Sequence, residues 1–203
     1  MKIRSFVILT LFLGLCMVTA ALADDAPHFN VALKANSAAI EGDVEAMLAI
    51  TPDSTLFLGV NGVYDEDDYK IAGLRALMGS QILTNGLTGK LGFKAMAGET
   101  DRQGPDSNIY GLGFMVSAVY DLSKALPDYE VPFVLSASAC LSPDPLSVND
   151  TDRIIEVTAD VDWNVLQNAA ITMGYRYIDI QFNDPRNWTE MNNSLYLGFK
   201  FKF

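Results

Sequence analysis

The stretch Ser194-Leu-Tyr-Leu-Gly-Phe-Lys-Phe-Lys-Phe203 alternates strictly between two kinds of residue. Polar or small residues stand between the apolar ones, which are Leu195, Leu197, Phe199, Phe201 and Phe203. A helix would scatter the apolar set around its surface, whereas a strand places it on one face and the other set on the opposite face. The stretch therefore predicts a β-strand with one apolar and one polar face.

The same period of two recurs through most of the chain. Ten segments alternate in this way, namely 29–35, 43–50, 55–64, 69–82, 87–98, 110–120, 133–142, 155–165, 171–177 and 194–203. Short and long connections follow one another between them, and the long ones are 37–42, 65–68, 99–108, 142–153 and 183–193. This is how outer-membrane barrels are built. We predict an all-β fold, a transmembrane antiparallel β-barrel of about ten strands with periplasmic termini, or of eight if the weak first hairpin does not form.

The alternative fold is a soluble sandwich or lipocalin-like barrel, with its apolar set facing inward. Glycine and serine are abundant on the polar faces, which suits a tight lumen better than a solvated surface. Aromatic residues stand near the strand ends, as membrane interfaces require, at Tyr64, Tyr110, Tyr120, Trp163, Tyr175 and Tyr177. The ten residues from Tyr110 to Tyr120 project to about 26 Å at a strand tilt near 40°, against an apolar band of about 25 Å. These features favour the membrane barrel.

Two turns predict the register of neighbouring strands. Asn85-Gly86 indicates a two-residue hairpin loop that pairs Thr84 with Leu87. The short turn at 166–168 pairs Val165 with Ala169, which places Arg176 opposite Thr158. Glu156 and Asp160 would then be diagonal neighbours of Arg176, within side-chain reach.

The N-terminal segment predicts export. Lys2 and Arg4 precede the apolar run 6–18, and Ala21-Leu22-Ala23 is a small-residue cleavage signature. The alternative is a transmembrane anchor, for which the 18 residues from 6 to 23 are the lower limit. Small residues at the end of the run and the lack of positive charges after it favour cleavage. The predicted domains are a signal peptide, 1–23, and an outer-membrane β-barrel, 24–203.

Composition excludes several classes of protein. The net charge of −11 argues against nucleic-acid binding, which needs a basic surface. Two cysteines are too few for a disulfide scaffold or a multi-cysteine metal centre. The hydrophobic content of 50% is too high for a disordered chain.

Charged residues on the polar faces predict a network inside the barrel. The predicted members are seven bases and five acids: Lys34, Arg75, Lys90, Lys94, Arg176, Lys200, Lys202, Asp43, Glu45, Glu156, Asp160 and Asp162. Charges in a narrow lumen are costly unless they are paired. The near balance therefore favours a structural ion-pair network over a transport path. The alternation changes phase after Tyr177, where Ile178, Ile180 and Phe182 are even-numbered, and a bulge or a strand continuing above the membrane would explain the change.

No catalytic, cofactor or metal site is predicted. The single histidine, His28, precedes the first strand at the periplasmic rim, whereas barrel hydrolases need a base near the outer leaflet. Cys140 is interpreted as a small neutral lumen residue. The acidic loop residues, with Asp65-Glu-Asp-Asp68 as the densest group, are interpreted as solvated charge, and divalent-cation binding is the alternative.

Several motifs are shared with a known family. Asp65-Glu-Asp-Asp68, Ser142-Pro-Asp-Pro-Leu-Ser147, Asn149-Asp-Thr-Asp-Arg153, Val165-Leu-Gln-Asn-Ala169 and Gly174-Tyr-Arg-Tyr-Ile178 occur in this order. With these motifs the chain resembles the YfaZ family of small outer-membrane proteins. The resemblance implies a monomeric barrel in the outer membrane of a diderm (Gram-negative) bacterium, and it implies no established activity.

The terminal strand also resembles the C-terminal signal that the barrel assembly machinery reads. Its signal positions would be the five apolar residues of the opening stretch. The expected partners are therefore that machinery and periplasmic chaperones during biogenesis, and outer-membrane lipid and lipopolysaccharide afterwards.

Three functions compete. The leading hypothesis is a small barrel with a side-chain-filled, charge-paired lumen and acidic outer loops, with a structural or interaction role in the envelope. The alternative is a narrow, porin-like diffusion channel that weakly favours anions, because seven bases line the lumen. The third, an outer-membrane enzyme, has no constellation of residues to support it.

Overall fold

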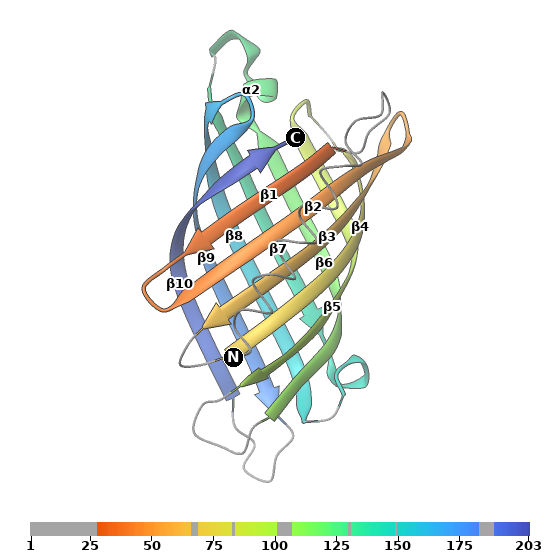
Figure 1. Cartoon of the computed structure of the whole chain (residues 1–203). Helices are drawn as coiled ribbons and strands as arrows, with labels where there is room; N and C mark the ends of the chain where they lie inside the picture. Colours follow the sequence, from red (N-terminus) through yellow and green to blue (C-terminus); the bar gives the residue numbers. More distant parts are fainter. Residues whose placement is uncertain are drawn as a thin grey trace.

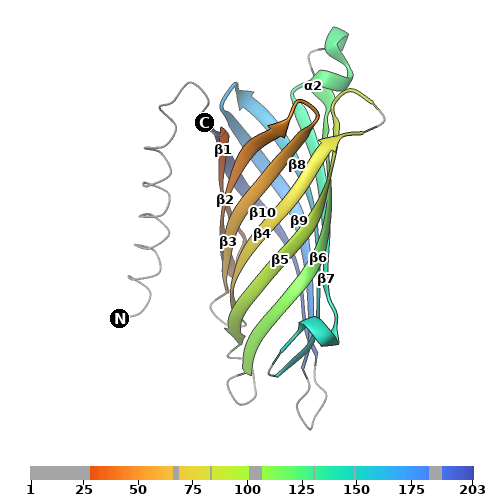
Figure 2. The ribbon, with the colours of Figure 1, turned by 90° about the vertical axis from the view of Figure 1, so that its right-hand side faces the viewer.

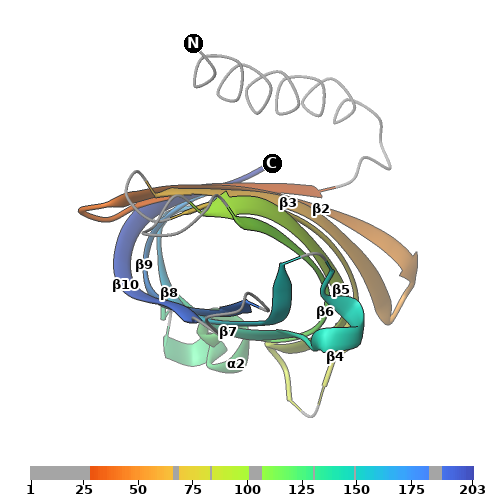
Figure 3. The same cartoon turned by 90° about the horizontal axis from the view of Figure 1, so that it is seen from below.

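The computed structural model is a closed barrel of ten antiparallel strands (Figure 1). It describes residues 28–65, 69–82, 84–100, 107–129, 131–148, 150–182 and 189–203. Each strand pairs with its neighbours in the chain, and β1 pairs with β10 to close the ring, which is oval when seen along the barrel (Figure 3). The prediction of a ten-stranded all-β barrel is confirmed, and the first hairpin is part of it.

All strands but β1, which has eight residues, are at least as long as the roughly 9–11 residues that a tilted strand needs to cross a bilayer. The ten strands are β1 (His28–Ala35), β2 (Ala39–Thr51), β3 (Ser54–Asp65), β4 (Tyr69–Gln81), β5 (Leu87–Thr100), β6 (Ser107–Asp121), β7 (Phe133–Ser142), β8 (Thr151–Leu166), β9 (Ala169–Phe182) and β10 (Thr189–Lys202). The short helices are α2 (Leu122–Ala125), η2 (Pro127–Tyr129) and η3 (Asp144–Leu146). Among the described residues, none of these helices has the length and apolar content of a membrane span.

The two ends of the barrel differ. The terminal end carries His28, Phe203 and the tight turns between β2 and β3 and between β8 and β9. On this end α2 and η2 project beyond the rim (Figure 2). The loop end carries the connections that follow β1, β3, β5, β7 and β9. One expected long loop is much shorter: residues 37–42 do not form a loop, because β2 already begins at Ala39.

The predicted registers were right in part. Thr158 lies opposite Arg176, as predicted, but at the turn itself Leu166 pairs with Ala169 instead of Val165, because the register shifts between Asn164 and Leu166. Between β4 and β5, however, Leu87 pairs with Ile82 instead of Thr84, because the Ile82 amide donates to the Leu87 carbonyl at 2.9 Å. The Asn85-Gly86 turn is present, with Gly86 at φ 88°, but it sits inside a longer loop. The shift of two residues leaves every side chain on its predicted face.

The outer surface of the barrel is apolar. Leu195 is 73% exposed and Leu74 is 61% exposed, whereas Lys94, on an inward-facing position, is only 4% exposed. A water-soluble barrel would show the opposite arrangement, with leucines inside and lysines outside. A continuous exposed apolar belt of this kind needs lipid around it. The protein is therefore a membrane barrel.

The alternation alone predicts a lumen that is polar throughout. In the structure, however, one end of the lumen is apolar. At the loop end, inward-facing apolar side chains form a plug of buried residues: Ala39, Val63, Tyr69, Ile71, Met96, Ile109, Cys140, Ile154, Ile178, Ile180 and Phe182. This plug explains the change of phase after Tyr177. The pairing of β9 with both neighbours is regular from Tyr177 to Gln181, and the one nearby register shift lies on β8, between Thr151 and Arg153, opposite Phe182 and Gln181. The even-numbered face of β9 therefore stays inside while its residues change from polar to apolar.

The plug should contribute to stability more than the lipid-facing surface does. Ile180→Ala removes a fully buried side chain and leaves a cavity, so we expect a loss of about 2–5 kcal/mol in the free energy of unfolding. Leu74→Ala removes a similar volume from the lipid-facing side, where lipid fills the space, and should cost less than about half as much. Urea unfolding of refolded protein in lipid vesicles measures both. Equal losses in the two variants would contradict a packed plug.

Candidate functional site

A belt of buried ion pairs crosses the middle of the lumen, and we call it the charge belt. It contains six bases and six carboxylates: Lys34, Arg75, Lys90, Lys94, Arg176, Lys200, Glu41, Asp43, Glu45, Glu156, Asp160 and Asp162. Each side chain occupies an inward position of its strand, and every member has at least one partner of opposite charge. The belt as a whole is therefore neutral.

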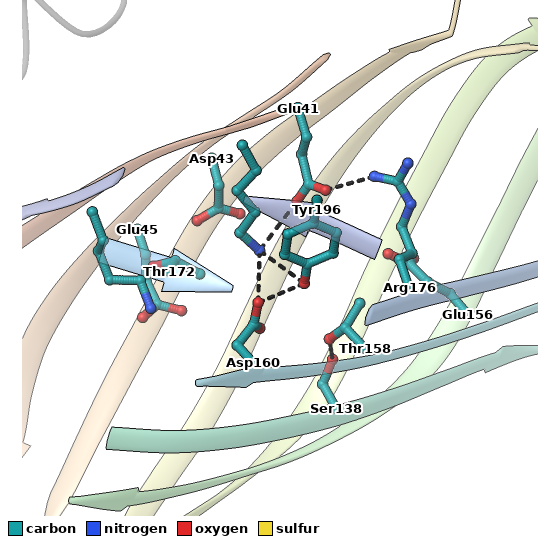
Figure 4. A network of polar contacts seen from close by, with 12 residues as sticks. Glu41, Asp43, Glu45, Ser138, Glu156, Thr158, Asp160, Thr172, Arg176 and Tyr196 are labelled. Atoms are coloured by element: carbon teal, nitrogen blue, oxygen red, sulfur yellow. Dashed lines mark hydrogen bonds and ion pairs between the residues drawn. The ribbon is translucent and has the colours of Figure 1, made fainter. Parts of the chain in front are cut away.

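One part of the belt joins strands that are not neighbours (Figure 4). Arg176 on β9 donates to Glu41 on β2 at 2.6 Å. Lys34 on β1 lies 3.6 Å from Glu41 and 3.4 Å from Asp160 on β8. The Tyr196 hydroxyl donates to Asp160 at 2.5 Å. These contacts connect five strands through the lumen, β1, β2, β8, β9 and β10, including β9 with β2 and β1 with β8, which share no backbone hydrogen bonds.

A second part of the belt lies between β2, β4 and β5. Arg75 donates to Asp43 at 2.5 Å and to Glu45 at 3.2 Å, so its guanidinium bridges two carboxylates. Lys90 donates to Glu45 at 3.1 Å, and its ammonium lies 3.6 Å from the centre of the Phe57 ring. The aromatic face adds a cation–π contact to the ion pair.

Two ion pairs complete the belt. Lys94 on β5 binds Glu156 on β8 at 2.5 Å, and the lysine side chain is 5% exposed. Lys200 on β10 pairs with Asp162 on β8, which also accepts a hydrogen bond from the Thr172 hydroxyl at 2.6 Å. In both pairs a long lysine side chain reaches a carboxylate on a strand that is not adjacent to its own, past β9 for Lys200 and past β6 and β7 for Lys94.

The charges of the belt pack closely against one another. The small space lined by Lys34, Glu41, Arg176 and Tyr196 leaves no room for a water molecule. Because most of these side chains are largely removed from solvent, each charge depends on its partner for stabilisation, and an unpaired member would carry the full desolvation cost. The register also places Arg75 directly opposite Lys94, two like charges. They are accommodated because Arg75 turns to β2 and Lys94 to β8.

The structure places eleven of the twelve predicted lumen residues in the belt. Lys202 is not a member of the belt, because its ammonium donates to the neutral amide oxygen of Asn164, at 2.8 Å, and not to a carboxylate. Glu41 is the member that the sequence did not indicate, since residues 37–42 were expected to be a loop. A shorter first hairpin would have placed Glu41 on the same face as Asp43 and Glu45.

Arg176 has the predicted diagonal neighbours but forms its ion pair with neither of them. Glu156 and Asp160 are its diagonal neighbours on β8, yet Glu156 binds Lys94 and Asp160 binds Lys34 and Tyr196. The guanidinium instead reaches across the lumen to Glu41, and it also donates to the Tyr69 hydroxyl at 3.4 Å. Apart from their inward-facing positions, nothing in the sequence marks Tyr69 or Glu41 as a partner of Arg176.

The other residues singled out in the sequence lie apart from the belt. His28 begins β1 at the terminal end, opposite Met47. Cys140 is a buried free thiol in the plug. Asp65 was expected to be solvated but is 2% exposed at the end of β3, and residues 66–68 lie outside the described residues. Within the part of the chain that the structure describes, no three metal-ligating side chains come together.

Comparison with known proteins identifies one family. A family model described as YfaZ precursor matches residues 9–203. No curated protein matches the chain. Among solved structures, the NanC porin is 12% identical with a TM-score of 0.49, over 88% of this chain and 100% of its own. OmpT, an outer membrane protein of Vibrio cholerae, is 11% identical with a TM-score of 0.35, over 87% and 81%. At such low identities and TM-scores, these two structures give no information about the function of this chain.

Breaking one ion pair of the belt should be costly, and removing both partners should not. Lys94→Met leaves Glu156 buried without its partner, so we expect a loss of about 3–5 kcal/mol in the free energy of unfolding. Adding Glu156→Leu should restore most of the loss. Lys124→Met, which breaks a pair whose lysine is 73% exposed, should cost less than about 1 kcal/mol. Urea unfolding compares the variants. A single Lys94→Met variant as stable as the wild type would contradict the pairing.

Proposed function

The chain belongs to the YfaZ family, and on that premise we propose that it is a closed barrel of the outer membrane of a diderm bacterium. Its role is structural or interactive, exercised through its outer loops instead of through its lumen. In this proposal the loop end faces the outside of the cell and the terminal end faces the periplasm.

The observation that carries the proposal is the pairing of the charge belt. A diffusion channel for anions needs basic side chains that are free to contact a passing solute. Arg75, Lys90, Lys94 and Arg176 are each bound to a carboxylate. The apolar plug at the loop end adds a second barrier to water and ions. Both features support a closed lumen over a pore.

Export and assembly follow the same proposal. Residues 1–23 act as a signal peptide, which agrees with the word precursor in the family description. The barrel assembly machinery and periplasmic chaperones are the proposed partners during biogenesis, and lipid and lipopolysaccharide are the proposed surroundings of the mature, monomeric barrel. We propose no catalytic role, because His28 lies at the rim, away from the belt and the plug.

Conductance tests the closed lumen. The refolded protein should give no discrete current steps in a planar bilayer, with a heat-shifted gel band as proof of folding. A variant that removes large plug and belt side chains, Tyr69→Ala with Arg176→Ser and Phe182→Ala, is the control that should conduct. Anion-selective steps from the folded wild type would contradict the proposal and make the belt a selectivity filter.

The mature N-terminus tests the proposed signal peptide. Mass spectrometry of the protein isolated from outer membranes should show a chain that begins at Asp24. Changing Ala21 and Ala23 to leucine should leave the precursor uncleaved, since the cleavage site needs small residues. A membrane-inserted wild-type chain that still begins at Met1 would show that the segment is an anchor.

A further inference from the structure

Strand β10 is paired with β1 along only part of its length. The paired part runs from Leu197, opposite Ala35, to the closing pair of Phe203 and Phe29. After Ala35 the chain turns into β2, so the hairpin of β1 and β2 ends while β10 continues to the loop end, as far as Thr189 (Figure 1). Residues 189–195 therefore form a strand edge that β1 does not cover, and we call it the β10 edge.

The direction of the backbone groups along the β10 edge follows from the paired part. Phe29 and Phe203 exchange two hydrogen bonds, so odd-numbered residues of β10 direct their amides and carbonyls toward the β1 side. The Lys202 amide bonds to Asn168, on the β9 side. Neither pairing of β10 has a register shift, so the odd residues that point away from β9 include Thr189, Met191, Asn193 and Leu195. No described residue forms a hydrogen bond to these backbone groups.

Most of the β10 edge lies beyond the hydrocarbon region. Leu195 lies opposite Tyr175 and Asn193 lies opposite Tyr177, and both tyrosines were predicted to mark the membrane interface. From that level to the loop end the outward positions become polar, as at Asn193 and Asp179. Water can therefore satisfy the backbone groups of the edge when it is free, and a partner can reach them.

The side chains of the β10 edge do not protect it from pairing. Natural edge strands are usually blocked by a lysine, a proline or a bulge. The outward side chains of this edge are uncharged, none is proline, and its pairing with β9 is regular. Met191 is 57% and Leu195 is 73% exposed. An extended edge of this kind is a template to which a further strand can add.

The charge around the β10 edge favours a basic strand. Outside the charge belt, the described residues at the loop end carry two bases, Lys70 and Arg153, and each is already paired with an acid, Glu99 or Asp179. The acids at this end are Asp65, Glu99, Asp144, Asp150, Asp152, Asp179 and Glu190. This excess of negative charge attracts lysine and arginine side chains and repels acidic ones.

A second copy of the chain fits the β10 edge less well than a separate segment does. Two barrels in one membrane hold their β10 strands in the same direction, each tilted by about 40°, so their edges would meet parallel and crossed. A separate extended segment can run antiparallel to β10, which is the more stable way for strands to pair.

We propose that the β10 edge binds an extended basic segment of another protein, which adds to the barrel wall as an antiparallel strand. The backbone groups of the odd residues hold the segment, and its apolar side chains lie on the outer face beside Met191 and Leu195. The inference rests on the proposed role at the loop end and names the kind of partner. A barrel that conducts but binds the segment would contradict only the closed lumen, and a silent barrel that binds none would contradict only this inference.

Peptide binding tests the proposal. The probe is a labelled synthetic peptide of eight residues in which valine and lysine alternate. Fluorescence anisotropy should show that it binds the folded mature barrel in phosphatidylcholine nanodiscs and does not bind empty nanodiscs. The same peptide with glutamate in place of lysine should bind about tenfold more weakly, because the loop end is acidic.

Methylation of the peptide amides tests strand pairing without changing the barrel. Only alternate amides of an added strand face the β10 edge. These belong to the valines, because residues that bond to Met191 and Leu195 place their side chains on the same outer face. N-methylation of the valines should weaken binding about tenfold, whereas N-methylation of the lysines should change it less than about twofold.

Asn193→Pro tests the edge from the side of the barrel. The Asn193 amide points away from β9, so proline removes no hydrogen bond of the barrel, and a heat-shifted gel band should show that the variant folds. Peptide binding should fall about tenfold. Asn193→Ala keeps the amide and is the matched control, which should bind the peptide as the wild type does.

Four results would overturn the proposal. The first is a folded wild-type barrel that binds the lysine peptide no better than empty nanodiscs do. The second is an equal effect of the two methylation patterns, or full binding by Asn193→Pro, since either excludes strand addition. The third is equal binding of the glutamate peptide, which excludes a basic partner. The fourth is a wild-type dimer that Asn193→Pro dissociates, which would make the edge an interface between two copies of the chain.

Discussion

A strand in lipid has no water to satisfy its backbone amides and carbonyls, so the sheet must close on itself. In this protein the closing pair is Phe29 and Phe203, whose backbones exchange two hydrogen bonds of 3.0 and 2.8 Å. Closure fixes the rest of the arrangement. One face of every strand must meet hydrocarbon, and the other must fill the enclosed space. The alternation of the sequence is the consequence, and it is inverted relative to a soluble barrel.

Ten strands enclose a wider space than eight, and short side chains cannot fill it. The protein fills it in two ways. At the loop end, residues such as Ile180 and Phe182 pack as an ordinary hydrophobic core. In the middle, arginine and lysine side chains cross the lumen, as Arg176 does to reach Glu41. Long basic side chains supply the reach, and the carboxylates that receive them remove the cost of the buried charge. The two solutions together place a packed apolar plug at the loop end and paired charges in the middle of the lumen.

The features of this structure that follow from the two-residue alternation of apolar and polar residues could be predicted from the sequence. The strand number, the lipid-facing residues and eleven belt members follow from the alternation, since side-chain direction depends only on parity. What could not be predicted depends on length and distance. Glu41 was missed because residues 37–42 were interpreted as a loop, whereas Asn36 closes a much tighter turn by accepting hydrogen bonds from the Ala38 and Ala39 amides. The partner of Arg176 was missed because contacts across the lumen depend on the stagger of distant strands and on side-chain reach. The β4–β5 register failed because Asn85-Gly86 fixes a turn without fixing how many residues flank it.

Because the charge belt is neutral, the net negative charge of the protein lies outside it. Among the residues that the structure describes, ten acids stand against four bases outside the belt. The lipid-facing surface of the described barrel is apolar, and these acids lie toward the two ends of the strands and in the connections. The electrostatic field of the protein is therefore a property of its two ends and not of its lumen. A solute inside the barrel would meet a balanced, occupied set of charges, whereas a cation or a basic partner approaching an end would meet an unbalanced acidic one. The proposed role at the loops is consistent with this distribution, since a partner there would meet uncompensated charge and a solute in the lumen would not.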